Sequence, residues 1–468
     1  MRIIRILGTM AAAALVVPLT AVAPLTSYAA GETCDGQPAT IVISSAPDPE
    51  EFGTTGDDVV DITTSDVFTF DALGGDDTIC AGPGTTDVIG GDGNDTIDLS
   101  ALTQNGRAEG DSADDTIIGS AHDDFIFGGD GNDTLSGGRG NDSLSGDAGD
   151  DLVMGGAGDD SVSGGSIGGG GASVSDTDMV QGGGGDDLVY DTASNESLVG
   201  GSGTDTLTLR TQDENDPEVC GGAPATTPKP VLSVVHQTVT GLGADTFSGF
   251  EAYQGGPYHD TLIGGPGPDH FQDNYCGVAQ LLGEGGNDTL ISDSCDARVD
   301  GGPGNDVLSF DSDGTGRFRG GPGNDRMLFA RGVDYACPDS TEFGSGPSAR
   351  AAEGGRGNNW LVLEPSAIRV VHRVDLFRRI VDAGPHHSAR LTDIQNVRQQ
   401  SDPRLSGGHL RIVGTAGPNI LIGGPGPTLI FGRQGNDVLR GGQGHDTVYG
   451  GTGHDRCRAE VRHECEAH

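Results

Sequence analysis

A nine-residue phrase, GGxGNDxLS, occurs twice in succession at residues 128–145, and variants of it recur along most of the chain. Stepping by nine from this point gives six uninterrupted units over residues 110–163. A fixed period of this kind is the signature of a repeat architecture, in which each unit packs mainly against its neighbours. The period therefore constrains the fold more than any other feature of the chain.

Each unit has the same internal order. Its first five positions are rich in Gly, position 6 is Asp, and position 8 is Ile, Leu or Val. The glycines suit tight turns with positive φ, and one inward aliphatic side chain suits a short strand. One unit is therefore predicted to form a turn and a strand, and two units a coil of 18 residues. Stacked coils predict an all-β fold, a parallel β-solenoid with irregular insertions.

Composition and charge agree with a narrow core and an acidic surface. The chain has 83 Gly and only 5% aromatic residues, too few large side chains for wide globular cores. Its formal net charge of -44 repels nucleic acid and attracts cations. The acidity lies upstream, because residues 341–468 hold 15 Arg and 13 acidic residues. We expect no nucleic-acid partner.

The phrase GGxGxDxUx, with U aliphatic, resembles the calcium-binding nonapeptide of RTX-type (hemolysin-type) secreted bacterial proteins. Units from GGDGNDTLS (128–136) to GGQGHDTVY (441–449) match this phrase closely. The resemblance implies a parallel β-roll in which Asp side chains of neighbouring coils share calcium ions. Calcium takes six to eight oxygen ligands, which carboxylates and turn carbonyls can supply.

The 18-residue coil places the Asp of every second unit one coil apart. The resulting pairs are Asp115–Asp133, Asp124–Asp142, Asp133–Asp151, Asp142–Asp160, Asp160–Asp178 and Asp187–Asp205. The candidate calcium ligands are Asp58, Asp77, Asp95, Asp115, Asp124, Asp133, Asp142, Asp151, Asp160, Asp178, Asp187, Asp205, Asp260, Asp269, Asp288, Asp306, Asp325, Asp437, Asp446 and Asp455. Position 6 lacks a carboxylate at Thr86, Gly169, Asn419 and Thr428, where we expect structural coils without a full site.

The remaining segments divide the chain. The start, with Arg2, Arg5 and an apolar run at 10–23, predicts a secretory signal peptide and hence an extracellular protein. No later segment is apolar enough to span a membrane. The predicted parts are a signal peptide (1–30), a lead-in (31–52), a calcium-binding β-roll (53–208), degenerate coils or a linker (209–254), a second calcium-binding β-roll (255–328), an Arg-rich insert (329–413), and a C-terminal β-roll block with a Cys-containing cap (414–468).

The Arg-rich insert and the cysteines leave alternatives open. The insert is expected to form coils without calcium, or else a small separate domain. SGFEAYQ (248–254) and TDIQNVRQ (392–399) resemble the strand that often leads into RTX blocks. Eight Cys in an exported chain favour disulfides, and of 105 possible connectivities only Cys457–Cys465 is singled out, by proximity.

No catalytic motif rises above chance, so we expect no enzyme. HExxH is absent, and the only lysine, Lys229, stands in TPKPV, which excludes a P-loop. We expect a secreted calcium-binding protein that folds on meeting extracellular calcium and has a structural, adhesive or cation-binding role. The alternative is a secreted enzyme or adhesin whose site lies in 329–413, with the repeats as a folding and export module. A cell-surface or matrix partner stays open.

Overall fold

The computed structural model describes most of the chain. The signal peptide predicted at 1–30 lies outside the described residues, as does the larger part of 209–229. The described residues are 33–45, 50–66, 68–165, 176–192, 194–209, 230–240, 244–256, 260–273, 280–292, 297–310, 316–329, 350–363, 371, 373–382, 389–400 and 409–465. Within these ranges every regular element is a strand, and none of them contains a helix that could cross a membrane.

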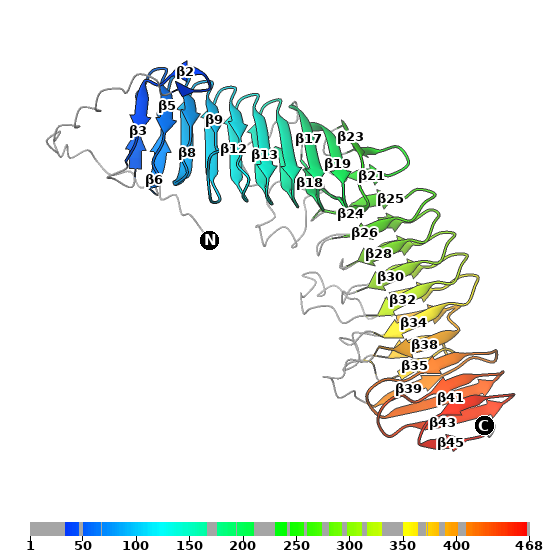
Figure 1. The fold of residues 1–468 in the computed structure, drawn as a ribbon. Coiled ribbons are helices and arrows are strands. Elements are labelled where there is room, and N and C mark those ends of the chain that lie inside the picture. Colours follow the sequence, from blue (N-terminus) through cyan, green and yellow to red (C-terminus); the bar gives the residue numbers. More distant parts are fainter. Residues whose placement is uncertain are drawn as a thin grey trace, which may run out of the picture.

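The strands form two long sheets that run side by side along a solenoid (Figure 1). In ladder order, sheet 1 consists of β3 (Ile41–Ile43), β5 (Val59–Ile62), β7 (Thr78–Cys80), β9 (Thr96–Asp98), β11 (Thr116–Ile118), β13 (Thr134–Arg139), β15 (Leu152–Ala157), β17 (Thr177–Gly184), β19 (Asn195–Ser202), β23 (Ala244–Ser248), β22 (Thr238–Thr240), β21 (Val231–Ser233), β25 (Thr261–Ile263), β27 (Gln280–Leu282), β29 (Arg298–Asp300), β31 (Arg317–Arg319), β33 (Arg350–Glu353), β37 (Ala389–Thr392), β36 (Ile380–Asp382), β35 (Arg373–Asp375), β39 (Leu410–Val413), β41 (Thr428–Gln434), β43 (Thr447–Thr452) and β45 (Val461–His463).

Sheet 2 is parallel throughout its length. It consists of β4 (Glu50–Phe52), β6 (Phe68–Asp71), β8 (Thr85–Asp92), β10 (Arg107–Ser112), β12 (Phe125–Asp130), β14 (Ser143–Ala148), β16 (Ser161–Gly165), β18 (Leu188–Asp191), β20 (Thr206–Leu209), β24 (Ala252–Gln254), β26 (His270–Gln272), β28 (Thr289–Ser292), β30 (Val307–Phe310), β32 (Arg326–Phe329), β34 (Trp360–Leu363), β38 (Asn396–Gln399), β40 (Ile420–Ile422), β42 (Val438–Arg440) and β44 (Arg456–Arg458).

The register of the ladders confirms the 18-residue coil. Ile117 pairs with Leu135, and Leu135 with Val153, in sheet 1. These position-8 residues are fully buried between the sheets. Each such side chain contributes about 1.5–3 kcal/mol on burial, so the core is a narrow column of aliphatic residues. The predicted all-β parallel solenoid is confirmed.

One coil is longer than the frame predicts. Val153 of β15 pairs with Val180 of β17, a step of 27 residues. The intervening unit, GGSIGGGGA (164–172), has Gly at position 8, and its part from residue 166 onward, with the predicted coil at Gly169, lies outside the described residues. The predicted pair Asp160–Asp178 is consequently wrong: the neighbour of Asp178 is Asp151, and that of Asp160 is Asp187.

Two antiparallel hairpins are inserted into sheet 1 alone. β21 and β22 lie between β23 and β25, and β35 and β36 lie between β37 and β39. Sheet 2 passes the same points without extra strands, since β24 pairs directly with β26 and β38 with β40. The segments that follow the hairpins contain SGFEAYQ and TDIQNVRQ, which therefore hold equivalent places in the fold.

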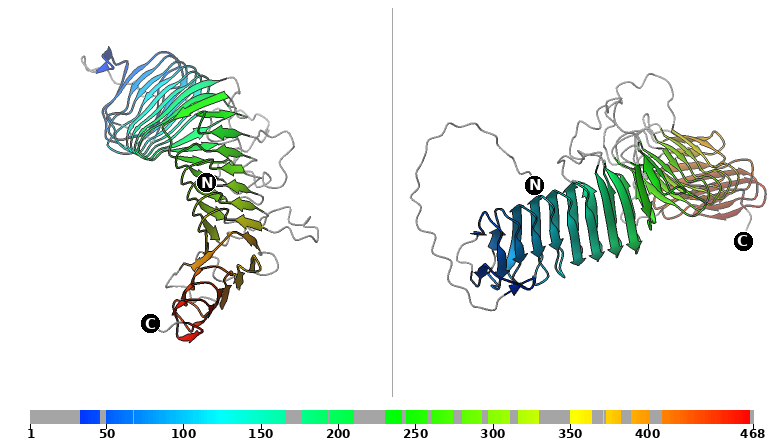
Figure 2. Two further views of the ribbon diagram at one scale, coloured as in Figure 1. Left: turned by 90° about the vertical axis from the view of Figure 1, so that its right-hand side faces the viewer. Right: turned by 90° about the horizontal axis from the view of Figure 1, so that it is seen from above.

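Each hairpin adds two strands to sheet 1 and none to sheet 2, which bends the solenoid axis. Two extra strands lengthen sheet 1 by about 10 Å at a spacing of ~4.8 Å, and packed sheets lie ~10 Å apart, so each hairpin should tilt the axis by roughly 45°. Figures 1 and 2 show the solenoid changing direction at these two places. At the first of them β21 and β25 lie on the outer side of the bend and β24 and β26 on the inner side (Figure 1).

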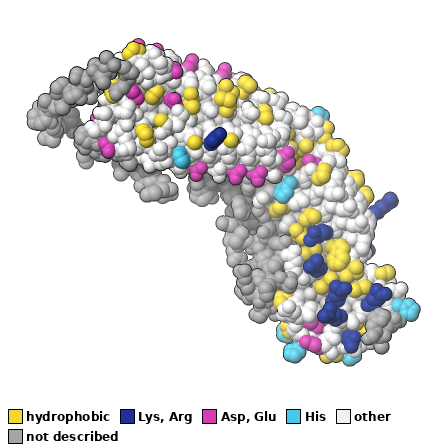
Figure 3. Space-filling model, viewed as in Figure 1, with side chains coloured by type: hydrophobic (Ala, Val, Ile, Leu, Met, Phe, Trp, Pro, Cys, Tyr) yellow, Lys and Arg dark blue, Asp and Glu magenta, His cyan; other side chains and the backbone are white. Residues whose placement is uncertain are grey.

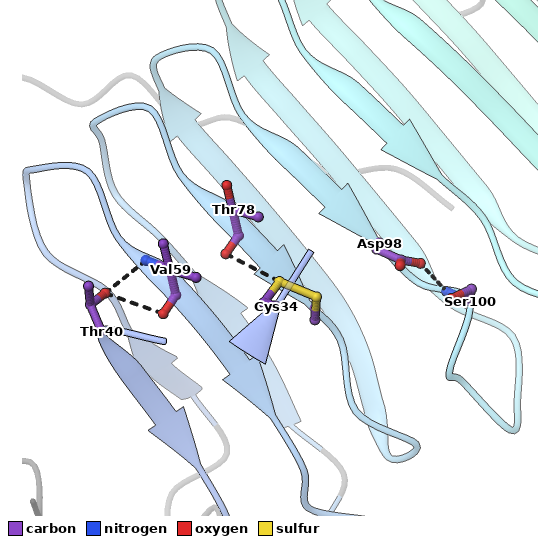
Figure 4. Close-up of a disulfide and its surroundings, with 7 residues drawn as sticks. Cys34, Thr40, Val59, Thr78, Asp98 and Ser100 are labelled. Atoms are coloured by element: carbon purple, nitrogen blue, oxygen red, sulfur yellow. Dashed lines mark hydrogen bonds between the residues drawn. A yellow bond between two sulfur atoms is a disulfide. The ribbon is translucent and has the colours of Figure 1, made fainter. Parts of the chain in front are cut away.

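Disulfides fasten both ends of the solenoid. Cys34 of the β1 (Thr33–Cys34) and β2 (Gln37–Pro38) hairpin is bonded to Cys80 of β7 (Figure 4). Cys457 of β44 is bonded to Cys465, the pair that the sequence singled out. On the face in Figure 3 most Arg side chains gather over the C-terminal part, and most acidic ones over the N-terminal part, as the charge distribution predicts.

Candidate metal sites

The position-6 Asp residues form two columns along the edges of the solenoid. The first column precedes the strands of sheet 1: the N–H of Asp115 donates to Oδ1 of Asp133 over 2.7 Å, and that of Asp133 to Oδ1 of Asp151 over 2.8 Å. The second column precedes the strands of sheet 2, where Asp124 and Asp142 are joined in the same way. Each carboxylate thus receives the backbone N–H of the preceding coil.

The other carboxylate oxygen, Oδ2, has no hydrogen-bond partner in most members of these columns. A buried polar atom without a partner costs free energy, and a buried charge costs more. The position-6 residues with a buried, unpartnered Oδ2 are Asp77, Asp95, Asp115, Asp133, Asp142, Asp151, Asp160, Asp187, Asp205, Asp260, Asp288, Asp306, Asp325, Asp437 and Asp455.

The glycine at position 1 shows what surrounds this oxygen. A Cβ atom on Gly128 would lie 2.2 Å from Oδ2 of Asp133 and 2.5 Å from the carbonyl oxygen of Gly146, one coil further on. An equivalent pair of oxygens, from the Asp five residues on and from a Gly one coil on, lies beside Gly110 and beside Gly137. Gly at these positions leaves room for two oxygens that approach its Cα. Both oxygens are acceptors, so either a proton on Oδ2 or a cation between the two oxygens would satisfy them together.

One coil carries an amide N–H in the same place and satisfies it without a cation: Nδ2 of Asn359 donates to the carbonyl oxygen of Asp393 over 3.0 Å. Asn419 is turned the other way, because its Oδ1 lies beside Gly414 and its Nδ2 donates to the carbonyl oxygen of Gln395 in the preceding coil over 2.6 Å. An amide offers donors that a carboxylate lacks. The contrast shows that the space beside position 6 is lined by carbonyl oxygens, which suits either an N–H donor or a hard cation.

Burial raises the pKa of these carboxyl groups above the ordinary range of Asp. The pKa of Asp115 and of Asp151 is raised to about 8, and that of Asp95 and of Asp142 to about 7. Removal from water is the largest cause, and like charges of the same column add to it, against the opposing effect of the backbone N–H bond. Since metal ligands must be ionised, calcium and protons compete for the columns.

The structure brings most of the predicted ligands into columns. In sequence order, the first column contains Asp58, Asp77, Asp95, Asp115, Asp133, Asp151 and Asp178. The second column contains Asp124, Asp142, Asp160, Asp187 and Asp205, then Asp269, Asp288, Asp306 and Asp325, and finally Asp437 and Asp455. Oδ1 of Asp446 accepts the N–H of Thr428, and the N–H of Asp446 donates to Oε2 of Glu460. Neither carboxylate oxygen of Asp260 has a hydrogen-bond partner.

Sequence reasoning missed several position-6 residues. Asn359 lies in GGRGNNWLV (354–362), which matches the phrase except for its amide, and Asp245 lies in TGLGADTFS (240–248). Glu196 replaces Asp in DTASNESLV (191–199). The nine-residue phrase could have found Asn359 and Glu196 if position 6 had been allowed to vary, and Asp245 if position 8 had been allowed to be aromatic.

Carboxylates alone do not make up the sites. Among the residues that the structure describes, no three His, Cys, Asp or Glu side chains are placed to hold a metal ion by themselves. Calcium in a column would therefore be held by two Asp side chains of successive coils together with turn carbonyls. Such a set of hard oxygen ligands fits calcium, which accepts carbonyl and carboxylate oxygens in irregular arrangements.

The fold and the columns define a class, a parallel β-roll whose turns present rows of carboxylates. A comparison with known families matches the RTX calcium-binding nonapeptide repeat at residues 109–144, 136–166, 174–207, 254–274, 279–308 and 422–457. The chain is an RTX-type repeat protein, and it is a calcium-binding β-roll protein. A comparison with curated proteins gives no significant match.

Proposed function

We propose that this calcium-binding β-roll protein is secreted, folds on meeting extracellular calcium, and serves outside the cell as a bent acidic rod with a structural or adhesive role. The observation that carries the proposal is the columns of buried Asp residues whose second oxygen has no partner. Two such residues are Asp133 and Asp142, both almost fully buried. Without a cation these columns hold like charges in rows, which opposes folding.

Calcium couples ligation to folding in this proposal. The two carboxylates of a site belong to successive coils, so the site exists only when the coils are stacked. The free energy of binding then becomes free energy of folding. Calcium-binding modules outside cells have Kd values of about 10⁻⁴–10⁻³ M, so the chain would stay largely unfolded in a low-calcium cytoplasm and fold after export.

Export is supported by the apolar, Arg-flanked start of the chain and by the two disulfides, which are typical of oxidising compartments. A rod suits a structural or adhesive role because its length follows from the number of stacked coils. The proposal gives the chain no catalytic role, since no catalytic motif in its sequence rises above chance.

Far-UV circular dichroism of the mature chain tests the proposal. After treatment with chelator we expect a largely unfolded spectrum, and addition of millimolar calcium should restore the β signal with a sigmoidal dependence on concentration. Magnesium at the same concentration is the control, because its demand for a small octahedral site disfavours these irregular ligands. An unchanged β signal in chelator would contradict calcium-dependent folding.

A further inference from the structure

Three Arg side chains form a straight row on the outer face of sheet 2, near its C-terminal end. Arg398 of β38 is in register with Ile422 of β40, and Ile422 is in register with Arg440 of β42. Arg440 is in register with Arg458 of β44. All three Arg side chains are exposed. Because strands lie ~4.8 Å apart, the three Arg positions follow one another at ~10 Å and then ~5 Å.

No acidic side chain of these strands balances the three residues, which we call the Arg row. β38, β40, β42 and β44 contain neither Asp nor Glu. The ion pairs between described residues include none of the three Arg side chains. The half-buried Ile420 and Val438 line up beside the Arg row on the same face. Like charges at neighbouring positions of a sheet repel one another, so an anionic partner would stabilise the Arg row.

Exposed carboxylates of the N-terminal part stand in rows that are built on the same strand spacing. The first turn row consists of position-5 residues, each of which directly precedes a buried position-6 Asp. The N–H of Asp76 donates to Oδ1 of Asp57 over 3.1 Å, and that of Asn94 to Oδ1 of Asp76 over 2.9 Å. Asp114 follows, since its N–H donates to Oδ1 of Asn94. The three Asp residues are exposed and stand one coil and then two coils apart, ~5 Å and ~10 Å.

A second turn row has the same construction along the second column. The N–H of Asn141 donates to Oδ1 of Asp123 over 2.8 Å, and that of Asp159 to Oδ1 of Asn141 over 3.0 Å. The N–H of Asp186 donates to Oδ1 of Asp159 over 2.9 Å. The three Asp residues are exposed and stand two coils and then one coil apart. In both turn rows the bonds between coils hold the carboxylates in place by one oxygen, Oδ1.

We propose that the Arg row of one copy of the chain binds a turn row of a second copy, with the two solenoids side by side. Both kinds of row take their spacing from the stacking of strands, so their charges coincide along the axis. Antiparallel copies match the Arg row to the first turn row, and parallel copies match it to the second. Arg440, the middle of the Arg row, then faces Asp76 or Asp159.

The charge distribution permits this contact in spite of the net charge of -44. The acidic residues lie mostly upstream of residue 341, and on the face in Figure 3 most Arg side chains gather over the C-terminal part. Exposed ion pairs are individually weak and are screened by salt, so the association should be weak and sensitive to ionic strength. The inference goes beyond the proposed function, since it requires only that the chain be folded.

Sedimentation velocity of the mature chain in saturating calcium tests the contact. The wild type should associate with rising protein concentration at ~50 mM salt and dissociate at ~500 mM. Arg440→Glu should weaken this association ~10-fold or more, because a carboxylate then faces carboxylates. Arg390→Glu, at an exposed position of β37 in sheet 1, is the matched control and should associate as the wild type does. Circular dichroism checks that each variant is folded, and Arg458→Glu replaces Arg440→Glu if the latter is not.

Equimolar mixtures of charge-reversed variants identify the partner row. Asp76→Lys or Asp159→Lys should restore association with Arg440→Glu, because the Lys of one copy then faces the Glu of the other. Rescue by Asp76→Lys indicates antiparallel copies, and rescue by Asp159→Lys indicates parallel ones. A wild type that stays monomeric at low salt, an association that Arg440→Glu leaves unchanged, or rescue by neither Lys variant would overturn the proposal and leave calcium-dependent folding intact.

Discussion

The coils at residues 107–165 and the described sheet-2 coils within 350–422, which contain β34, β38 and β40, pair in the same parallel way and differ in how position 6 is filled. The first region has Asp at every position 6 from Asp115 to Asp160. The second has Asn359, Gln395 and Asn419 in the equivalent hydrogen-bond chain, in which the N–H of Asn359 donates to Oε1 of Gln395. The same turn is thus built once with carboxylates and once with amides.

The difference teaches that this coil does not need a metal for its own geometry. Where an amide N–H stands beside the turn carbonyl, it satisfies that carbonyl, as at Asn359. Where a carboxylate stands there, an acceptor faces acceptors, as Oδ2 of Asp133 does beside the carbonyl of Gly146. We therefore expect the acidic columns to be costly in the absence of calcium and favourable in its presence, and the N-terminal region to depend on calcium for its stability.

Chelation should produce the largest difference between the two regions. We expect amide hydrogen exchange in peptides from 107–165 to accelerate by several orders of magnitude when calcium is removed, because buried like charges lose their counter-ions. Peptides from 350–422 should keep much more of their protection. Hydrogen-exchange mass spectrometry of one sample with and without chelator measures both regions together. Equal loss of protection in both would break the comparison.

Gly128→Ala should abolish the local site in the acidic region. The new Cβ would lie 2.2 Å from Oδ2 of Asp133, so the coil must shift or the ligand must leave. Overpacking of this kind costs about 3 kcal/mol, and the lost ion adds to it. Gly56→Ala is the matched control, since no atom lies within 4 Å of its Cβ. Thermal unfolding in saturating calcium should show a large shift for the first variant and almost none for the second.

Asn419→Asp should carry the calcium dependence into the amide region. The substitution removes the donor that satisfies the carbonyl of Gln395, at a cost of about 1–3 kcal/mol for a buried unsatisfied group. Peptides around residue 419 should lose exchange protection in chelator and regain it in calcium. Asn419→Ala is the control, because it removes the donor without adding a charge and should not respond to calcium. A calcium-independent Asn419→Asp would contradict the account.

Acidification should have the smallest effect and should stabilise the metal-free acidic region. Because burial raises the pKa of Asp115 and Asp151 to about 8, these groups bind protons more tightly when folded. The stabilisation from these protons is fully present below pH ~4, the pKa range of Asp in an unfolded chain. It is lost as the pH rises through about 8, the pKa in the folded chain. In chelator, the far-UV β signal of the largely unfolded chain should increase as the pH falls from 8 to 5. A fall over that range would contradict the assignment.

Much of this architecture follows from a nine-residue phrase because each position has one physical task. Leu135 fills the core, Asp133 faces its counterpart one coil away, and Gly128 leaves room for two oxygens. The phrase could not predict the hairpins, since β21 and β35 pair with strands that lie about 30 or more residues further along the chain and carry no period of nine. Non-local pairing of this kind leaves no local pattern.

The columns of candidate ligands were predictable to the same extent as the fold. The prediction went wrong in places for related reasons. The frame placed the columns correctly until the extra unit 164–172, which has Gly at position 8, moved the partner of Asp160 from Asp178 to Asp187. Glu196 escaped notice because it departs from the phrase, and its place in the first column follows only from its register with Asp178. A departure from a repeat is informative only once its neighbours are known.

A crystal structure grown in calcium, with anomalous scattering recorded for the metal, tests the central claim most directly. The account predicts anomalous peaks beside the unpartnered oxygens of the columns, such as Oδ2 of Asp115, Asp133 and Asp142, and none beside Asn359 or Asn419. Columns without peaks, or peaks of equal height beside the two amides, would contradict it.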